Sequence, residues 1–151
     1  MTSSSLTTLV AAGFVRAGIW RGGEDIHHFV PAQPGVYVFV VQGKIMYVGS
    51  SKGTVEKTTL RSRMRSYQRS QSNGLSKRPV HLAIAELHKV KGKIEVFTLV
   101  PDMSEQQIKW KGLPIDLVTG LEAGLIRKFI PKWNIRGRPT VSETVSKRSF
   151  E

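Results

Sequence analysis

Two short apolar runs on either side of Gln42-Gly43 form one strongly patterned region of the chain. The first, Val36 to Val41, is almost entirely β-branched or aromatic, and the second runs from Lys44 to Val48. Such side chains favour strands, and the Gln-Gly pair between them supplies the residues of a tight turn. The pattern therefore predicts a β-hairpin.

Apolar positions at helical spacing and their bounding residues predict four helices. They run from about Leu6 to Ala12, Thr59 to Arg69, Val80 to Val90 and Ile115 to Phe129. In the third of these, the predicted apolar side consists of Leu82, Ile84, Ala85, Leu87 and Val90. A third strand is predicted from Ile94 to Val100, stopped by Pro101. This order of elements predicts a single α+β domain around a small sheet.

The charge of the chain narrows the class of partner. With 23 Lys+Arg against 11 Asp+Glu, the formal net charge is +12, which favours a polyanion such as nucleic acid. Structural nucleic-acid binders share this balance, so charge alone indicates a partner and no activity. The absence of cysteine excludes disulfides, thiolate zinc sites and a cysteine nucleophile.

Targeting signals are not evident. No run approaches the roughly 20 apolar residues that a membrane-spanning helix needs. The segment Met1 to Ser5 lacks the basic residues that open a signal peptide. We therefore expect a cytoplasmic protein without a membrane partner.

A basic segment carries the first candidate chemistry. Between Lys52 and Arg78 the chain has eight Lys/Arg and one acid. Arg61, Arg65 and Arg69 recur every four residues, which places them in one stripe along a helix. The stripe fits either a DNA-backbone contact or a solvated helix face.

Arg63 lies off this stripe, roughly 200° round the helix from Arg61. It shares its side with Leu60, Met64 and Tyr67. We therefore predict that Arg63 leans inward and is paired with an acid, a phosphate or a carbonyl, because an unpaired buried charge is costly.

An acid interrupts the apolar stripe of the last helix. Val118, Glu122, Leu125 and Phe129 follow the spacing of a core-facing side. A carboxylate there must be neutralised, pair with a base or coordinate a cation. Two interpretations stay open: a buried Glu–Arg pair, or a ligand to Mg²⁺, which keeps most of its waters and also takes phosphate oxygens.

The predicted hairpin contains two short tyrosine motifs, Gly35-Val36-Tyr37 and Tyr47-Val48-Gly49. Because a turn separates them, spacing alone leaves open whether the two phenols share a face. Together with further short motifs later in the chain, they resemble the motifs of the GIY-YIG nuclease family over about residues 34–136. The matched residues are Tyr37, Tyr47 and Gly49 on the hairpin, the catalytic arginine Arg63 and then Tyr67 within Leu60–Tyr67, the metal-binding Glu122 within Leu121–Ile126, and Asn134 within Pro131-Lys132-Trp133-Asn134.

The resemblance implies a small three-stranded antiparallel sheet flanked by helices, within a nuclease-like domain over residues 31–138. Residues 1–30 are then an N-terminal helical or irregular extension, and residues 139–151 a basic, partly disordered tail.

The chain departs from the family pattern after Gly49. Repair-type members have eight residues from this glycine to the arginine, whereas Gly49 to Arg63 is fourteen, so Gly53–Thr59 resembles an insertion. Arg61 and Arg65 remain alternatives to Arg63. Ser50 stands where many members carry a lysine, with Lys52 close enough in sequence to reach in. The lengthened loop, and Gly112-Leu113-Pro114 ahead of the last helix, resemble the restriction-type branch.

The activity implied is that of a Mg²⁺-dependent DNA endonuclease of restriction type, with Mn²⁺ as a substitute metal. In-line attack by water would use Tyr37, with a lowered phenol pKa, as general base. Arg63 would stabilise the phosphoryl oxygens and Glu122 would hold the metal. Tyr47 and Tyr67 would position groups or relay protons, and Asn134 would brace the site.

The expected DNA-backbone contacts are Lys52, Arg61, Arg65, Arg69, Lys132 and Arg136. A homodimer would allow one active site per chain to cut both strands. The alternatives are a repair, mobile-element or single-strand-specific nuclease, and a DNA-binding module that has lost catalysis.

Overall fold

The computed structural model describes residues 2–52, 58–102 and 104–134 of the 151. The predicted tail 139–151, Arg136 and most of the segment Gly53–Thr59 lie outside these residues. The elements in chain order are α1 (Thr2–Ala11), β1 (Val15–Trp20), the 3-10 helix η1 (Ile26–Phe29), β2 (Gly35–Val41), β3 (Lys44–Ser51), α2 (Leu60–Asn73), α3 (Pro79–Lys89), β4 (Ile94–Leu99), the 3-10 helix η2 (Glu105–Gln107), β5 (Lys109–Trp110), β6 (Leu113–Pro114) and α4 (Leu117–Phe129).

The main sheet is antiparallel and has the strand order β1-β4-β2-β3, so β3 is an edge strand. The α+β class is confirmed, but the sheet has four strands where the sequence predicts three. The additional strand, β1, lies within the segment expected to be an extension. Its apolar alternation is weak because Arg16 and Gly18 interrupt it, a bulge separates these two residues, and Trp20 alone in the strand is fully buried.

The predicted hairpin forms from β2 and β3. Gln42 and Gly43 both have positive φ, 50° and 75°, as a two-residue turn of type I′ requires. Tyr37 pairs with Gly49, and Phe39 with Tyr47, before the register shifts by one residue. This β-bulge lets Tyr37 and Tyr47 lie on the same face of the sheet, which the spacing alone could not establish.

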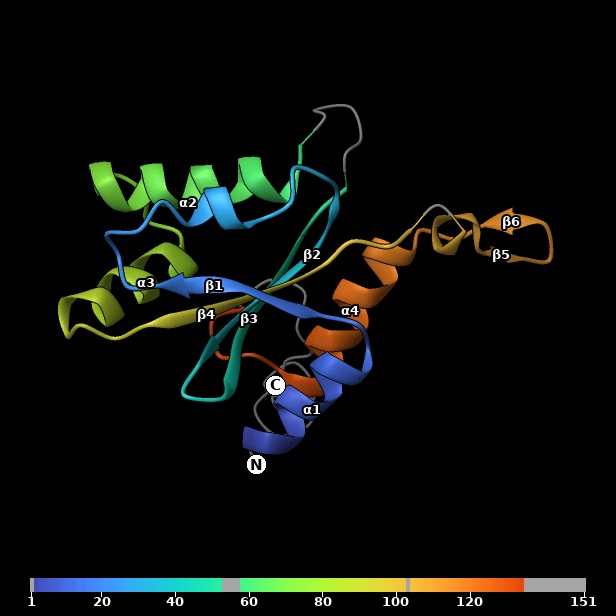
Figure 1. Ribbon diagram of the computed structural model, residues 1–151, viewed down its shortest axis with the longest axis horizontal. Coiled ribbons are helices and arrows are strands. Elements are labelled where there is room, and N and C mark those ends of the chain that lie inside the picture. The colour runs from blue at the N-terminus through green and yellow to red at the C-terminus, as the bar shows by residue number, and fades with distance from the viewer. Residues whose placement is uncertain (1, 53–57, 103, 135–151) are drawn as a thin grey trace, which may run out of the picture.

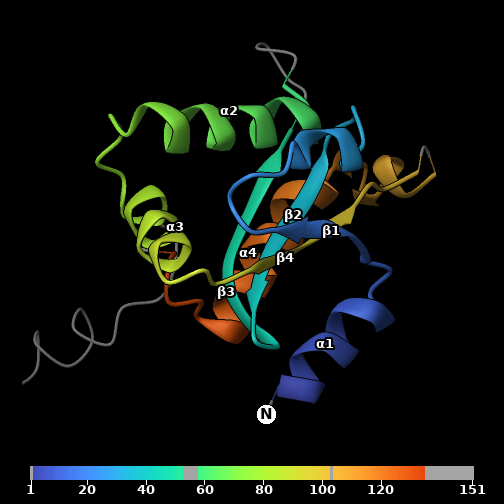
Figure 2. The same cartoon turned by 60° about the vertical axis from the view of Figure 1, so that its left-hand side comes forward.

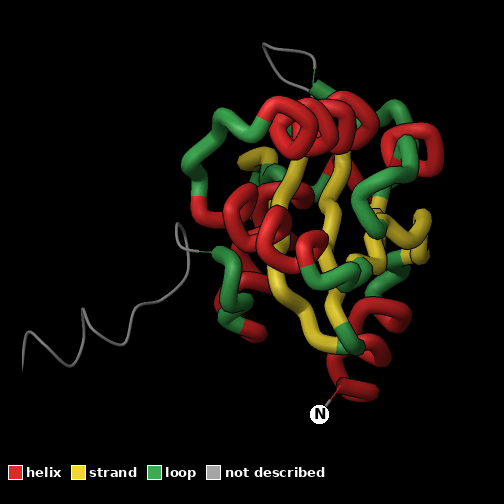
Figure 3. Tube along the Cα trace, turned by 90° about the vertical axis from the view of Figure 1, so that its left-hand side faces the viewer, coloured by secondary structure: helices red, strands yellow, loops and turns green. Residues whose placement is uncertain are grey.

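Helices cover both faces of the sheet. Helices α2 and α3 lie on one face and α1 and α4 on the other (Figures 1 and 2), and in Figure 3 helices pass in front of the strands. Side chains of β2 alternate between the layers, so that Tyr37 and Phe39 pack with α2 and α3, whereas Val36 and Val38 pack with α1 and α4. Two apolar cores therefore sandwich one sheet.

Helix α3 differs from its predicted apolar side. It buries Val80 and Ile84 and partly buries Leu87, whereas Leu82 and Val90 are exposed. The buried positions follow i, i+4, i+7, and Leu82 lies two residues from Val80, on the other side of the helix. No helix in the described ranges is long and apolar enough to cross a membrane.

Candidate active site

Three tyrosines from distant parts of the chain meet under α2. The ring centroids of Tyr37 and Tyr47 are 6.1 Å apart, and Tyr67 lies edge-on to both, at 5.9 Å and 6.4 Å. The Tyr37 and Tyr67 hydroxyls are 2.7 Å apart in a hydrogen bond in which either can donate. The structure thus brings together the three phenols that the sequence motifs select.

Gly49, the glycine of the second tyrosine motif, has a steric role. Gly49 faces Tyr37 across the hairpin, and a Cβ at Gly49 would lie within 2.3 Å of the Tyr37 ring and hydroxyl. Any larger residue would push this phenol out of its place. Gly49 therefore allows the Tyr37 ring to lie flat across β3.

Burial controls the ionisation of Tyr37. The side chain is almost wholly buried, and this burial raises the phenol pKa well above its ordinary value. The neighbouring Tyr47 and Glu122 raise the pKa further, whereas the hydrogen bond with Tyr67 and the Arg63 guanidinium lower it. The expectation of a lowered Tyr37 pKa is therefore wrong, because desolvation outweighs the nearby positive charge.

Alkaline titration tests this environment. Burial also raises the pKa of Tyr67, so both phenols stay protonated in the folded chain above pH 10, where they ionise in the unfolded chain. The stability that they contribute is fully present below about pH 10 and is lost as the pH rises beyond it. In a 295 nm absorbance titration, Tyr37 and Tyr67 should ionise only as the protein unfolds.

The variants Tyr37→Phe and Tyr67→Phe should each remove one late-titrating group from that experiment. Ionisation of Tyr37 and Tyr67 near pH 10 in the folded protein would contradict the effect of burial on this pair.

Arg63 belongs to α2, which begins with a capping box between Thr59 and Ser62. The helix buries Leu60, Met64 and Tyr67, as predicted, but Arg63 is exposed, so its predicted inward lean is wrong. Arg63 lies roughly 70° from the centre of the buried stripe, at its border. Its guanidinium is nevertheless close enough to lower the Tyr37 pKa, which places positive charge beside the tyrosine cluster.

Arg61 has a different environment from the rest of its stripe. Its Nε donates to the Val30 carbonyl at 3.0 Å, and its backbone N–H donates to the Pro31 carbonyl at 3.1 Å. Arg65 and Arg69 are exposed. Arg61 therefore fastens α2 to the chain ahead of β2, and Arg65 and Arg69 are left facing solvent.

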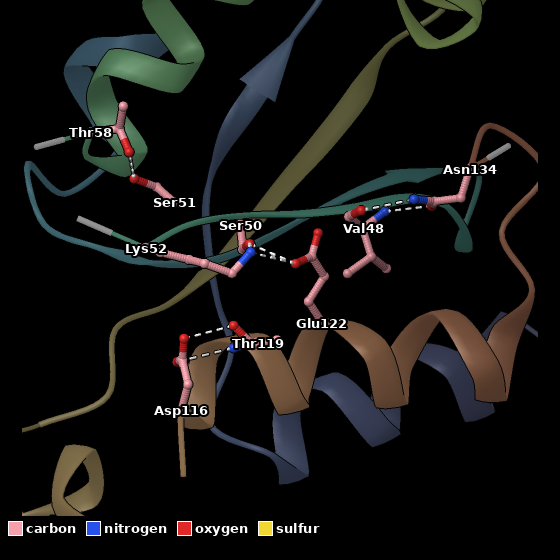
Figure 4. A network of polar contacts seen from close by, with 9 residues as sticks. All are labelled: Val48, Ser50, Ser51, Lys52, Thr58, Asp116, Thr119, Glu122 and Asn134. Atoms are coloured by element: carbon pink, nitrogen blue, oxygen red, sulfur yellow. Dashed lines mark hydrogen bonds and ion pairs between the residues drawn. The ribbon is translucent and has the colours of Figure 1, made fainter. Parts of the chain in front are cut away.

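Glu122 reaches the site from the other layer of the sandwich, in the second turn of α4. Its Oε1 accepts a hydrogen bond from Ser50 Oγ at 2.7 Å and lies 3.5 Å from Lys52 Nζ (Figure 4). Lys52 Nζ also donates to Ser50 Oγ at 3.3 Å. The Glu–Arg pair left open by the sequence is therefore a Glu–Lys pair, in which Lys52 remains exposed beside Glu122.

The donor set fits one hard cation. Among the described residues, both polar contacts of the Glu122 carboxylate use Oε1, and Figure 4 shows Oε2 pointing away from Ser50 and Lys52. No group of three or more His, Cys, Asp or Glu that could hold a metal occurs in that part of the chain. A single carboxylate is nonetheless sufficient for Mg²⁺, which keeps waters and binds substrate phosphates. The Lys52 ammonium shows that cationic charge is accommodated beside Glu122.

A pocket of about 710 Å³ opens beside Glu122, between the N-terminus of α3 and α4. Its lining includes Tyr47, Asn134, Trp133 and Arg78. Arg78 lies in the basic segment, but the sequence does not select it as a site residue, because it precedes Glu122 by more than forty positions and no local pattern joins them. The pocket supplies a cation and an aromatic ring next to the candidate metal ligand.

Asn134 closes the exposed edge of β3. Its Oδ1 accepts from the Val48 N–H at 2.8 Å and its Nδ2 donates to the Val48 carbonyl at 2.9 Å. The neighbouring Trp133 N–H donates to the Met46 carbonyl at 2.8 Å. The side chain thus replaces the strand that β3 lacks on this side and holds the segment that lines the pocket.

Loss of this side chain should destabilise the fold. Asn134→Ala leaves both polar groups of Val48 without their buried partner, at a cost of about 2–4 kcal/mol in the free energy of unfolding. Urea unfolding measures this cost. Lys132→Ala, at an exposed position in the same segment, is the matched control and should be neutral. Equal stability of the two variants would show that water replaces the Asn134 bonds at no cost.

Comparison with known proteins gives structural matches only. No family model matches the chain, and no curated protein matches it either. The GIY-YIG N-terminal endonuclease domain of UvrC from Thermotoga maritima, bound to magnesium, is 27% identical, with a TM-score of 0.44 over 70% of this chain and 88% of that one. A mutant of bacteriophage T4 EndoII is 15% identical, with a TM-score of 0.61 over 87% of this chain and 98% of the other. Restriction endonuclease HPY188I in complex with product DNA is 23% identical, with a TM-score of 0.35 over 64% of this chain and 56% of the other.

The T4 EndoII likeness extends over nearly the whole of both chains and shows a shared architecture. The antiparallel hairpin, the helices on both faces and the cluster of Tyr37, Tyr47 and Tyr67 agree with the motifs read from the sequence. The chain therefore has the fold of the GIY-YIG nucleases.

Proposed function

We propose that the protein is a divalent-metal-dependent DNA endonuclease that hydrolyses phosphodiester bonds with Mg²⁺. The observation that carries this proposal is the position of Glu122, whose Oε1 alone is engaged among the described residues, beside a pocket that Tyr47 of the tyrosine cluster and Arg78 also line. Single-carboxylate sites of this kind suit a metal that completes its shell with water and phosphate. When bound, the metal would supply charge stabilisation for the phosphate and the leaving oxygen.

The roles of the side chains follow from their positions. Glu122 would hold the metal, with Ser50 fixing Oε1 so that Oε2 is left for the cation. The exposed guanidinium of Arg63 would donate to the phosphoryl oxygens, where paired charged donors are strongest.

Tyr37 is the candidate base, with Tyr67 as its hydrogen-bond partner. Its raised pKa keeps it protonated at neutral pH, so it first acts as a donor that orients the attacking water. Arg63 already lowers this pKa relative to burial alone, which is the direction that a general base requires. Tyr47 borders the pocket and would position the same water, while Asn134 braces the strand beneath it.

The restriction-type assignment rests on sequence features. Two features support the restriction type over a repair, mobile-element or single-strand-specific nuclease. They are the long segment between Gly49 and Arg63 and the Gly112-Leu113-Pro114 motif. Cleavage of both strands from one site per chain favours a homodimer. A mixed DNA library cut in Mg²⁺, with its ends sequenced, separates these classes. Recurrent ends at one short sequence support the restriction type.

A DNA-binding module without catalysis is the second candidate, and the +12 charge supports it equally. The intact set of Tyr37, Arg63 and Glu122 favours the enzyme. Plasmid nicking in Mg²⁺ and in EDTA distinguishes the two candidates, since the module binds under both conditions and cuts under neither.

Salt dependence should identify the DNA-binding surface. About six phosphate contacts give a slope of log K against log salt near −5, because each contact releases roughly 0.9 counterion. Binding by the wild type in EDTA measures the slope. Arg65→Ala and Arg69→Ala should each reduce the slope by about one.

Arg61→Ala is the matched control for this measurement. Its guanidinium already donates to the Val30 carbonyl, so its loss should change the slope less. A flat salt response of the wild type would remove the nucleic-acid assignment altogether.

A further inference from the structure

A small ribbon projects from the body of the protein just before α4. Strands β5 and β6 pair only with each other among the described residues, with Trp110 opposite Leu113 and Lys109 opposite Pro114. Lys111 and Gly112 form the turn, with φ of 51° and 83°. Figure 1 shows the ribbon extending beyond the N-terminal end of α4, away from the sheet.

One face of this ribbon is apolar and open to solvent. Trp110 is 62% exposed and Leu113 is 65% exposed. Ile108 and Ile115 are joined by a backbone hydrogen bond, lie two positions from these residues on the same face, and are exposed as well. Large apolar side chains clustered on a protruding element mark an interaction surface.

Positive charge accompanies the apolar face. Lys111 Nζ lies 5.3 Å from the centre of the Trp110 ring, and the exposed Lys109 follows on the same ribbon. There is no acidic residue between Ile108 and Ile115. The ribbon therefore presents an aromatic and aliphatic surface edged by ammonium groups.

The base of the ribbon adjoins the candidate active site. Ile115 is followed by Asp116, the N-cap of α4. The Asp116 carboxylate accepts a hydrogen bond from Thr119, and the charge of Lys52 helps to lower its pKa. Lys52 in turn pairs with Glu122. Along the axis of α4, Glu122 lies about 8 Å from the first residue of the helix, and the ribbon extends roughly 10 Å beyond that residue. DNA advances about 3.4 Å per base pair, so a duplex across Glu122 would pass the ribbon within about six base pairs.

We propose that the β5–β6 ribbon is a DNA wedge, which inserts Trp110 and Leu113 into the minor groove at a base step to one side of the scissile phosphate while Lys109 and Lys111 contact the flanking phosphates. The inference rests on the proposed nuclease function and adds a second contact to its DNA site. The wedge face is aliphatic and aromatic, and apolar wedges at the minor groove unstack a base step and bend the duplex.

A second copy of the chain is a weaker occupant of this face. A two-fold contact would bring the two Lys111–Trp110 pairs together and bury like charges between chains that each carry +12. Four apolar side chains on each copy also fall far short of the roughly 20–30 residues per side in a stable interface. Phosphates, in contrast, neutralise the same ammonium groups.

The test uses duplexes centred on the cleavage position found by end sequencing, each with one 2-aminopurine at a successive position. In EDTA, the wild type should raise 2-aminopurine fluorescence at a base step within about six base pairs on one side of the cut. Trp110→Ala should abolish that increase and weaken binding by about tenfold, since loss of one base–aromatic stack has an effect of this order. Trp110→Phe should retain part of both effects. Val90→Ala removes another exposed apolar side chain, just after α3, and should match the wild type.

The outcomes are distinguishable. Trp110→Ala with the wild-type fluorescence response and affinity overturns the wedge. A response unchanged in Trp110→Ala, together with dissociation of a dimer in sedimentation, assigns the ribbon to contact between copies and also overturns it. A wild type that cuts DNA without any 2-aminopurine response removes the wedge and leaves the nuclease proposal standing. A wild type that neither binds nor cuts DNA overturns both.

Discussion

Glu122→Ala should lower Mg²⁺-dependent cleavage by at least about 10³-fold, at the upper end of the cost of losing one charge-stabilising group. Among the described residues that line the pocket, Glu122 provides the only carboxylate, so none of these neighbours can take over the metal. Its loss also removes the acceptor that holds Ser50 and Lys52 in place. Initial rates of plasmid nicking at saturating Mg²⁺ measure the effect.

The same variant should bind DNA at least as tightly as the wild type in EDTA, because a negative charge near the phosphate is gone. The pair of Glu122 with the exposed Lys52 is worth less than about 1 kcal/mol, so the fold should persist. Glu122→Gln is the matched control, because its amide oxygen can still accept from Ser50 but carries no charge for a metal. Near-native cleavage by either variant would show that the metal ligand lies elsewhere.

The hairpin and the helices were predictable because the intrinsic preference of their residues and the pattern of their buried side chains indicate the same secondary structure. β2 is buried on both faces by two helical layers, which is why Val36–Val41 reads as a nearly continuous apolar run. β1 is the opposite case. It is an edge strand held by backbone pairing to β4. Arg16 and Gly18 interrupt the alternation of apolar and polar residues that would have predicted a strand.

The β5–β6 ribbon was missed for a related physical reason. Each strand has two residues, and only the positive φ of Lys111 and Gly112 makes the turn that pairs them. Ile108 and Trp110 alternate with Lys109 and Lys111, but four residues are the shortest run that predicts a strand, and Gly112-Leu113-Pro114 does not continue the alternation.

The motifs select candidate site residues, but the environments of these residues depend on tertiary contacts that the sequence does not show. Tyr37 and Tyr47 share a face because of the bulge in the hairpin. The raised pKa of Tyr37 follows from burial beneath α2, and no spacing rule encodes that burial. Lys52 reaches Glu122 only because β3 and α4 pack together, 70 positions apart in sequence.

The site forms at β3 because β3 is an edge strand. Tyr37 and Tyr47 approach from the α2/α3 layer, and Glu122 approaches from the α1/α4 layer. An interior strand would have neighbours on both sides and keep these layers apart. At the open edge, which Asn134 covers over only part of its length, side chains from both layers reach one pocket.

Arg63→Ala should lower the cleavage rate by about 10²–10³-fold without lowering stability, because its guanidinium is exposed and accessible to phosphate. Arg63→Lys should restore little, since an ammonium cannot offer the paired donors of a guanidinium. Single-turnover cleavage at saturating enzyme isolates the rate from binding.

The other two arginines of α2 supply the controls for that measurement. Arg61→Ala loses the bond to the Val30 carbonyl and should lower the free energy of unfolding by about 1 kcal/mol while leaving the saturated rate near that of the wild type. Arg69→Ala should weaken binding and keep both rate and stability, because its side chain faces solvent. These three signatures differ because the three side chains end in different places: beside the buried phenol of Tyr37, on a backbone carbonyl and in open solvent. Equal rate losses in all three variants would mean that α2 presents a uniformly charged face and that the catalytic arginine is another residue, with Arg78 in the pocket the next to replace.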